Sequence, residues 1–220
     1  MLLDTNLFIL QDVLGDNNCF YRAIINELVW RSKIDKLDND DPTKLFKQKY
    51  FNSKNSYLDI KKYCNDNYQS TLIKTLKLKI NKYLKKNRQL IIPELDINIG
   101  SLVSITHDMS IEQYLNVEVN LWAGLLEQII VSNLFRVPII ILKAYSKNGG
   151  KLCEGIIKNS KPNKNVKYKV IQIIYPIHSI KGLPIYLLWK KYSNGIDHYM
   201  SIYLNDLDMD SDILFSSSSL

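Results

Sequence analysis

The sequence predicts an α+β fold in which a mostly antiparallel sheet of about five strands packs between helices. Helical patterns occupy the first part of the 220-residue chain, and short apolar runs occupy the last part. A hydrophobic fraction of 46% with 23% charged residues is ordinary for a globular protein with a sizeable core. We expect a single domain over residues 1–204. Residues 205–220 are acidic and rich in serine, so we expect a disordered tail or a linker there.

Apolar residues at helical spacing predict that the first part of the chain is mainly helical. The repeat of Phe20, Ala23, Ile24 and Leu28 is typical of a helix that begins at Cys19. We expect helices over residues 19–32, from Pro42, over 56–87 (unbroken, or broken near 65–67), over 110–115 and over 121–135. We expect loops over 35–41 and 91–100.

Five short runs rich in β-branched and aromatic residues predict the strands. Glycine, proline and asparagine separate these runs, as they do in antiparallel sheets. The expected strands cover residues 137–142, 154–157, 169–175, 184–189 and 199–204.

A strongly basic stretch lies within the third expected helix. Apolar residues recur on one face between residues 71 and 88, which predicts an amphipathic helix with a basic outer surface. A solvated face in a chain rich in Lys, Asn, Ile and Tyr is the simplest interpretation of the +7 net charge. Little arginine and no interleaved aromatic residues disfavour a nucleic-acid partner. The basic residues are Lys74, Lys77, Lys79, Lys82, Lys85, Lys86 and Arg88.

Cysteine usage and hydropathy restrict the cellular context. The three cysteines, Cys19, Cys64 and Cys153, are odd in number and lack zinc-ligand spacing. This predicts no disulfide framework, no metal site and a reducing compartment such as the cytoplasm. No apolar run approaches the roughly 20 residues that cross a bilayer, and the first residues lack the basic region of a secretion signal. We therefore expect no membrane partner.

The most informative segment is residues 16–24, Asp-Asn-Asn-Cys-Phe-Tyr-Arg-Ala-Ile, where a turn becomes a helix. Side-chain oxygens of its three polar residues can cap the helix, so Cys19 falls in the first turn. Unpaired N–H groups and the helix dipole favour negative charge there, which favours a nucleophilic thiolate and the binding of an oxyanion. A buried structural cysteine at a helix start is the simpler alternative.

One of the three histidines is placed to act as a base. His198 stands between a turn at Gly195 and a strand-like run, whereas His107 lies in a predicted loop or helix start and His178 at a predicted strand end. A catalytic cysteine and its histidine are normally far apart in sequence. The pattern therefore favours Cys19 as nucleophile and His198 as its base.

Three blocks in register resemble the ovarian-tumour (OTU) family of cysteine proteases, which are mainly deubiquitinases. Residues 16–24 are similar to the family's Asp-Gly-Asn-Cys-Leu/Phe-Phe/Tyr-Arg/His-Ala/Ser-Ile/Val. Residues 122–141 resemble the family's Trp-Gly-Gly-x-x-Glu helix and the central strand after it, and Trp122 is expected to pack beneath the site. Residues 184–199 are similar to the strands that deliver the catalytic histidine. The resemblance implies a papain-like OTU fold over about residues 12–204. Separately, the bias toward Lys, Asn, Ile and Tyr is typical of an AT-rich genome, such as that of a large DNA virus.

By position, the resemblance implies that Cys19 is the nucleophile and His198 the general base. Asp16 corresponds to the motif's aspartate, which shapes the oxyanion loop, and is counted with the catalytic residues. The backbone N–H of Cys19 would donate to the oxyanion, while Asn17 and Asn18 would hold the loop. Asn17 stands where the family commonly has glycine, and asparagine tolerates positive φ, so the loop geometry can persist.

Met200 departs from the family pattern. Many members carry Asn or Asp two residues after the histidine, on the same strand face, where it orients the imidazole. Methionine cannot accept that hydrogen bond usefully, so either another residue orients His198 or the site works as a dyad. The candidates for an orienting residue are Asp4, Asp12, Asn194 and Asp197, of which Asp197 is the weakest because its side chain alternates to the opposite face.

The resemblance implies a thiol-dependent deubiquitinase that cleaves isopeptide bonds at the C-terminus of ubiquitin, or of a ubiquitin-like modifier, through an acyl-enzyme. No cofactor is needed, the expected partner is ubiquitin or a polyubiquitin chain, and we expect a monomer in the cytoplasm. The alternative is an OTU-fold module that binds ubiquitin but is catalytically weakened by Met200. A basic nucleic-acid-binding protein is a further alternative.

Overall fold

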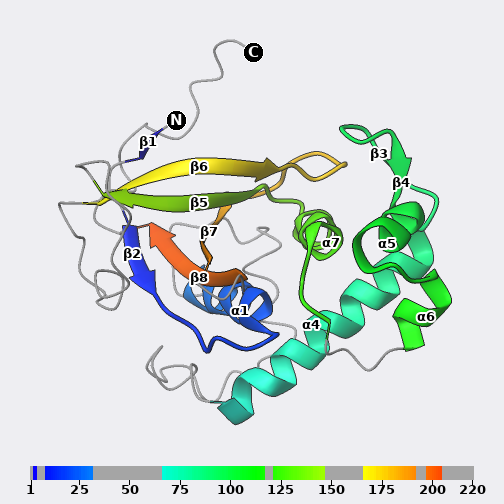
Figure 1. Cartoon of the computed structure of the whole chain (residues 1–220), viewed down its shortest axis with the longest axis horizontal. Coiled ribbons are helices and arrows are strands. Elements are labelled where there is room, and N and C mark those ends of the chain that lie inside the picture. The colour runs from blue at the N-terminus through cyan, green and yellow to red at the C-terminus, as the bar shows by residue number, and fades with distance from the viewer. Residues whose placement is uncertain are drawn as a thin grey trace.

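The computed structural model describes residues 2–3, 8–31, 66–116, 121–146, 166–191 and 197–204. Its centre is a six-stranded sheet with the order β1-β6-β5-β7-β8-β2 (Figure 1). The strands are β1 Leu2–Leu3, β2 Phe8–Gln11, β5 Ile139–Ser146, β6 Val166–Ile174, β7 Ile185–Lys191 and β8 Asp197–Leu204.

The sheet is mostly antiparallel, as the sequence predicts. Among the strands that the structure describes, β5 and β7 are the one parallel pair, and the other neighbouring pairs are antiparallel. The α+β class is therefore confirmed. Among the described residues the sheet has six strands, namely four of the five expected strands together with β1 and β2 at its two edges. Neither edge strand was expected, since runs of two and four residues carry little periodic signal. The predicted strand over 154–157 lies outside the described residues.

Helices account for most of the remaining described chain. They are α1 Cys19–Arg31, α4 Asp66–Asn87, α5 Ile99–His107, α6 Ile111–Asn116 and α7 Leu125–Phe135. Helix α4 passes beside α1 and α7, while α5 and α6 gather at its far end with a hairpin of β3 Ile91–Ile92 and β4 Ile97–Asn98 (Figure 1). None of the described helices is both long enough and apolar enough to cross a bilayer.

Two predicted segments differ from the structure for local reasons. The expected loop over 91–100 contains the β3–β4 hairpin and the start of α5, whose first turn is capped where Asn98 Oδ1 accepts the Ser101 N–H at 2.7 Å. Helix α7 begins at Leu125 rather than at residue 121, because the Glu127 carboxylate accepts the Gly124 N–H at 2.7 Å and fixes the cap there. Predictions over 32–65 and 205–220 lie outside the described residues.

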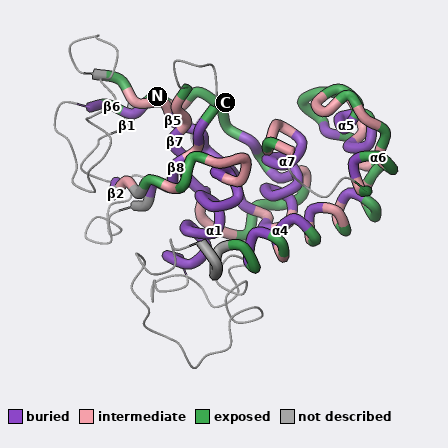
Figure 2. Tube along the Cα trace, turned by 60° about the horizontal axis from the view of Figure 1, so that its bottom comes forward, coloured by how far each residue is buried: buried purple, intermediate pink, exposed green. Residues whose placement is uncertain are grey.

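The sheet has a different apolar cluster on each face. Side chains from β5, β6 and β7, such as Ile141, Ile174 and Leu187, pack with the helices in one cluster. Side chains on the opposite face, such as Leu188 and Met200, pack with other strand residues. Helix α1 lies in the first cluster and is buried along its whole length (Figure 2), so its position is fixed on every side.

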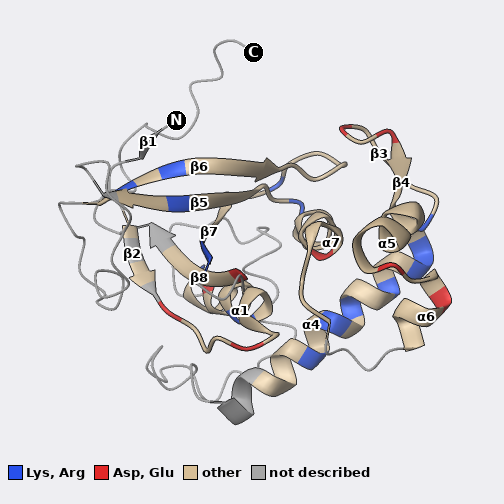
Figure 3. Cartoon of the chain, in the orientation of Figure 1, with Lys and Arg blue, Asp and Glu red and all other residues tan. Residues whose placement is uncertain are grey.

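Basic residues follow α4 (Figure 3), as the sequence predicts. Not all of them face solvent. Lys74, Lys82, Lys85 and Lys86 are exposed. Lys77 is only 7% exposed, which corrects the prediction that it belongs to the basic outer surface. It lies among the apolar residues of the helix face turned toward α1 and α7, one position after the fully buried Leu76.

Buried polar groups tie the end of α1 to the chain before β7. The Arg31 guanidinium donates to the carbonyl groups of Leu183 and Pro184 and to the Glu27 carboxylate. Burial raises the pKa of Glu27 to about 7, because desolvation of its charge outweighs the attraction of Arg31. Glu27 therefore makes the stability of the fold depend on pH in the weakly acidic range.

Replacing Glu27 by Gln should flatten this dependence. The unfolded chain loses the Glu27 proton near pH 4.5 and the folded chain near 7, so the associated stability is present below 4.5 and lost as the pH rises through 7. Between pH 5 and pH 7 the wild type should lose about 2 kcal/mol of unfolding free energy that Glu27→Gln retains. Urea unfolding at both pH values measures this, and equal losses in the two proteins would contradict it.

Candidate active site

Cys19 is the first residue of α1 and is held by the packing of that helix. The residue is 2% exposed, and the next two, Phe20 and Tyr21, are each 1% exposed. The centres of the Phe20 and Tyr21 rings lie 5.5 Å apart in an edge-to-face arrangement. The thiol position is therefore set by the hydrophobic core rather than by the preceding loop.

His198 lies near the start of β8 and is hydrogen-bonded to Asp12. The distance from His198 Nε2 to Asp12 Oδ1 is 2.9 Å. Asp12 follows β2, and the pairing of Gln11 with Ser201 brings the end of β2 alongside β8. The imidazole is 2% exposed and the Asp12 side chain 51% exposed, so water screens one side of this contact.

Cys19 and Asp12 both act on the imidazole. Burial lowers the pKa of His198, but hydrogen bonds with Asp12 and Cys19 and the negative charge of both groups outweigh it and raise the pKa to about 9. The segment that links Asp12 to Cys19 passes close to the imidazole, since a Cβ on Gly15 would lie 3.8 Å from His198 Nδ1. The arrangement favours a protonated imidazole facing the sulfur at neutral pH.

Two of the four candidates for an orienting residue, Asp12 and Asp197, are described by the structure, and Asp12 is hydrogen-bonded to His198. Asp4 and Asn194 lie outside the described residues. Asp197 is exposed and lines a cavity beside the site. Met200 is 1% exposed and packs on the strand-only face of the sheet, so it serves the core.

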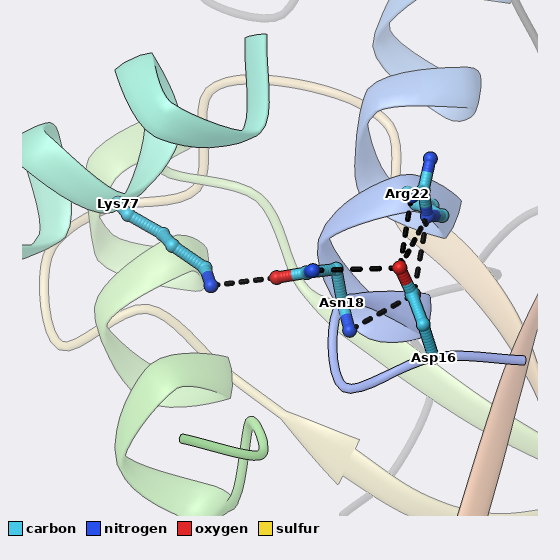
Figure 4. Close-up of polar contacts among 4 residues, drawn as sticks. All are labelled: Asp16, Asn18, Arg22 and Lys77. Carbon is cyan, nitrogen blue, oxygen red and sulfur yellow. Dashed lines mark hydrogen bonds and ion pairs between the residues drawn. The ribbon is translucent and has the colours of Figure 1, made fainter. Parts of the chain in front are cut away.

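Asp16 organises the turn before Cys19 (Figure 4). Its carboxylate accepts hydrogen bonds from Arg22 Nη2 at 2.8 Å and from the Asn18 N–H at 3.0 Å. Burial raises the pKa of Asp16, but the hydrogen bonds and charge of Arg22 outweigh it and hold the pKa below its usual value. The Asp16 carboxylate thus binds both the residue before Cys19 and a residue one turn into α1, and these contacts suit a loop-shaping role.

The backbone of this turn differs from the expectation for an oxyanion hole. The Cys19 N–H donates to the Asp16 carbonyl at 3.0 Å, and the Asn18 N–H donates to the Asp16 carboxylate. The Cys19 N–H would therefore have to leave the Asp16 carbonyl to bind an oxyanion. The resemblance could not reveal this contact, because the motif fixes residue types and not the turn geometry.

A cavity of about 410 Å³ opens beside Cys19. Trp122 is 40% exposed and precedes α7, which corrects the expectation that it packs beneath the site as core. Because α7 begins three residues later, Trp122 stands in the cavity wall. The lining residues are Asn17, Cys19, Phe20, Trp122, Ala123, Asp197 and Tyr199.

A buried carboxylate supports the wall that carries Trp122. Glu127 is fully buried and accepts hydrogen bonds from His107 Nε2 at 2.9 Å, Tyr114 OH at 2.6 Å and the Gly124 N–H at 2.7 Å. Burial raises the pKa of Glu127, but these bonds and the charge of His107 outweigh it and lower the pKa. His107 thus ends α5 and joins it to α7. Sequence reasoning missed this role because it placed His107 in a loop or helix start and predicted no helix over 99–107.

The described residues hold no group of three or more His, Cys, Asp or Glu side chains arranged for a metal ion. Cys19 is the free cysteine of the described chain, whereas Cys64 and Cys153 lie outside it. His178 is exposed on the segment before β7.

The chain is similar to several solved structures. The Hazara virus OTU bound to ubiquitin is 15% identical, with 93% of this chain and 87% of that chain covered and a TM-score of 0.45. The OTU domain of OTUD1 is 18% identical over 89% and 85% of the two chains, with a TM-score of 0.43. The Farallon virus OTU protease is 13% identical over 93% and 89%, with a TM-score of 0.40.

All three are OTU domains. No family model and no curated protein matches the chain.

Replacing His107 by Ala should destabilise the protein without changing the thiol. The buried Glu127 carboxylate would lose a hydrogen-bond donor, and this loss costs about 1–3 kcal/mol of unfolding free energy. The rate of Cys19 alkylation by iodoacetamide should stay unchanged. Urea unfolding and alkylation kinetics measure the two effects.

His178→Ala is the matched control, since His178 is exposed. It should leave stability and alkylation unchanged. If the His107→Ala variant is fully folded under the assay conditions and its Cys19 is still alkylated more slowly than in the wild type, His107 acts on the thiol and the prediction is wrong.

Proposed function

We propose that the chain is a cysteine isopeptidase that removes ubiquitin, or a similar modifier, from proteins. The observation that carries the proposal is the position of His198 between Asp12 and Cys19. A thiol beside an imidazole that a carboxylate holds in place is the arrangement of a nucleophile and its base. The choice of ubiquitin comes from the sequence blocks that resemble OTU proteases.

The proposed reaction begins at Cys19. Its thiolate attacks the carbonyl carbon of the modifier's C-terminal glycine, and a tetrahedral oxyanion forms on the side of the Asn17–Cys19 turn. The His198 imidazolium then donates its proton to the leaving lysine amine, and the C–N bond breaks. Water attacks the thioester carbon while the neutral His198 takes its proton, and the C–S bond then breaks. This step releases the modifier's C-terminal carboxylic acid, which ionises, and restores the Cys19 thiolate beside the His198 imidazolium.

Asp12 supports catalysis over the alternative of a weakened ubiquitin-binding module. That alternative depends on Met200 leaving the imidazole without an orienting partner. The 2.9 Å contact between Asp12 and His198 supplies a partner from the neighbouring strand instead. The cavity beside Cys19, with Trp122 and Tyr199 in its wall, gives an extended peptide C-terminus access to the sulfur.

A ubiquitin probe with a C-terminal electrophile tests the proposal. The wild type should form a covalent adduct at Cys19, and Cys19→Ala should form none while it retains its fold. His198→Ala should lower fluorogenic turnover by about two to four orders of magnitude, because general-base catalysis and thiolate pairing are both lost. Intact-mass spectrometry detects the adduct, and peptide mapping of the digested protein locates it. Binding of ubiquitin without an adduct would favour the binding module.

Substitutions at Asp12 and Met200 should separate the two possible sources of imidazole orientation. Asp12→Ala should lower turnover roughly tenfold to a hundredfold, less than loss of a buried triad aspartate, because Asp12 is half exposed. Met200→Asn should be neutral or harmful, because a buried amide would lack partners in the apolar cluster around Met200. Both are measured on one fluorogenic ubiquitin substrate. A gain from Met200→Asn with no loss from Asp12→Ala would contradict this assignment.

A further inference from the structure

We infer that Lys77, a residue of α4 far from Cys19 in sequence, is a positioning residue for the turn that precedes the nucleophile. The inference rests on the proposed function, since it concerns the acyl transfer at Cys19. Lys77 Nζ donates to Asn18 Oδ1 at 2.6 Å, and Asn18 is the residue immediately before Cys19 (Figure 4).

The contact with Lys77 completes a chain of polar contacts across the turn. Asn18 Nδ2 faces Asp16 Oδ2 at 3.4 Å, the Asn18 N–H donates to Asp16 Oδ1, and Arg22 holds the same carboxylate. Arg22 and Asp16 both belong to the segment around Cys19, so they brace the turn against its own helix. Lys77 is the member of this group that comes from another helix, and it therefore ties the turn to the body of the protein.

The location of Lys77 is unusual for a lysine of an amphipathic helix. The residue is 7% exposed, and its ammonium group lies 4.6 Å from the centre of the Tyr21 ring. Burial lowers the pKa of Lys77 to about 8, opposed by the charges of Asp16 and Glu127. A buried ammonium group is costly, and an apolar residue of similar volume is often neutral or stabilising in such a position.

Turn and thiol are held in different ways, and this difference makes the inference testable. Cys19 is fixed by the burial of α1, whereas Asn17 and Asn18 precede the helix and lie half buried among polar contacts. Loss of Lys77 should therefore loosen the turn that faces the developing oxyanion and leave the sulfur beside His198. Oxyanion stabilisation acts in the transition state, so kcat should change and KM should not.

Lys77→Met is the decisive variant, because methionine fills a similar volume and tolerates contact with an aromatic ring. We expect kcat on a fluorogenic ubiquitin substrate to fall about tenfold, less than the hundredfold or more for loss of an oxyanion donor. KM, the iodoacetamide alkylation rate of Cys19 and the melting temperature should not fall. Lys82→Met, an exposed lysine of the same helix, is the matched control and should behave as wild type.

A double-mutant cycle tests whether Lys77 acts through Asn18. Asn18→Ala alone should lower kcat by a similar factor, and adding Lys77→Met should lower it little further. Independent, multiplying losses would overturn the inference, as would an unchanged or increased kcat in Lys77→Met. A fall in melting temperature and alkylation rate together with kcat would also overturn it, because Lys77 would then be merely structural. If the wild type itself shows no Cys19-dependent turnover, the proposed function fails and this inference fails with it.

Discussion

Strand β8 is the element on which the site depends, because it joins the three segments that carry the reacting groups. His198, the proposed base, lies on β8 itself, the pairing of β8 with β2 brings Asp12 alongside, and its packing on α1 brings Cys19. Ser201 reinforces this packing, since its hydroxyl group donates to the Ala23 carbonyl at 3.2 Å. Asp12 and Cys19, near the start of the described chain, therefore meet His198, near its end, at this one strand.

The site combines a rigid thiol with a turn held by polar contacts. Helix α1 is buried along its whole length, so Cys19 cannot move without disturbing the core. The preceding turn is held instead by Asp16, Arg22 and Lys77. In this turn the Cys19 N–H still donates to the Asp16 carbonyl. To bind an oxyanion, the turn would have to rearrange slightly so that the Cys19 N–H leaves the Asp16 carbonyl, while the Cys19 side chain stays fixed. Such a change suits an oxyanion that forms only in the transition state.

Sequence reasoning reached the α+β class and most long elements, because α1, α7 and the apolar strands have strong periodic patterns. It missed β1 and β2, whose few residues gain their structure from pairing with β6 and β8. For the same reason it could not single out Asp12 among its candidates, since the contact of Asp12 with His198 depends on the pairing of β2 with β8. Lys77 was assigned to a solvated face because a lysine pattern does not reveal that Asn18 and Tyr21 lie opposite. Trp122 was expected in the core because the helix was predicted to begin at residue 121. The later start of α7 depends on the cap that the Glu127 side chain forms with the Gly124 N–H, and periodicity does not reveal that contact.

The central claim is that His198 is held in its charged form between Asp12 and Cys19. A titration of the His198 ring carbon signal by NMR, in protein labelled with ¹³C at histidine, tests this claim most directly. The account predicts a midpoint near pH 9, because the two neighbouring groups favour the imidazolium. A midpoint at or below 6.5, the ordinary value for histidine, would contradict it.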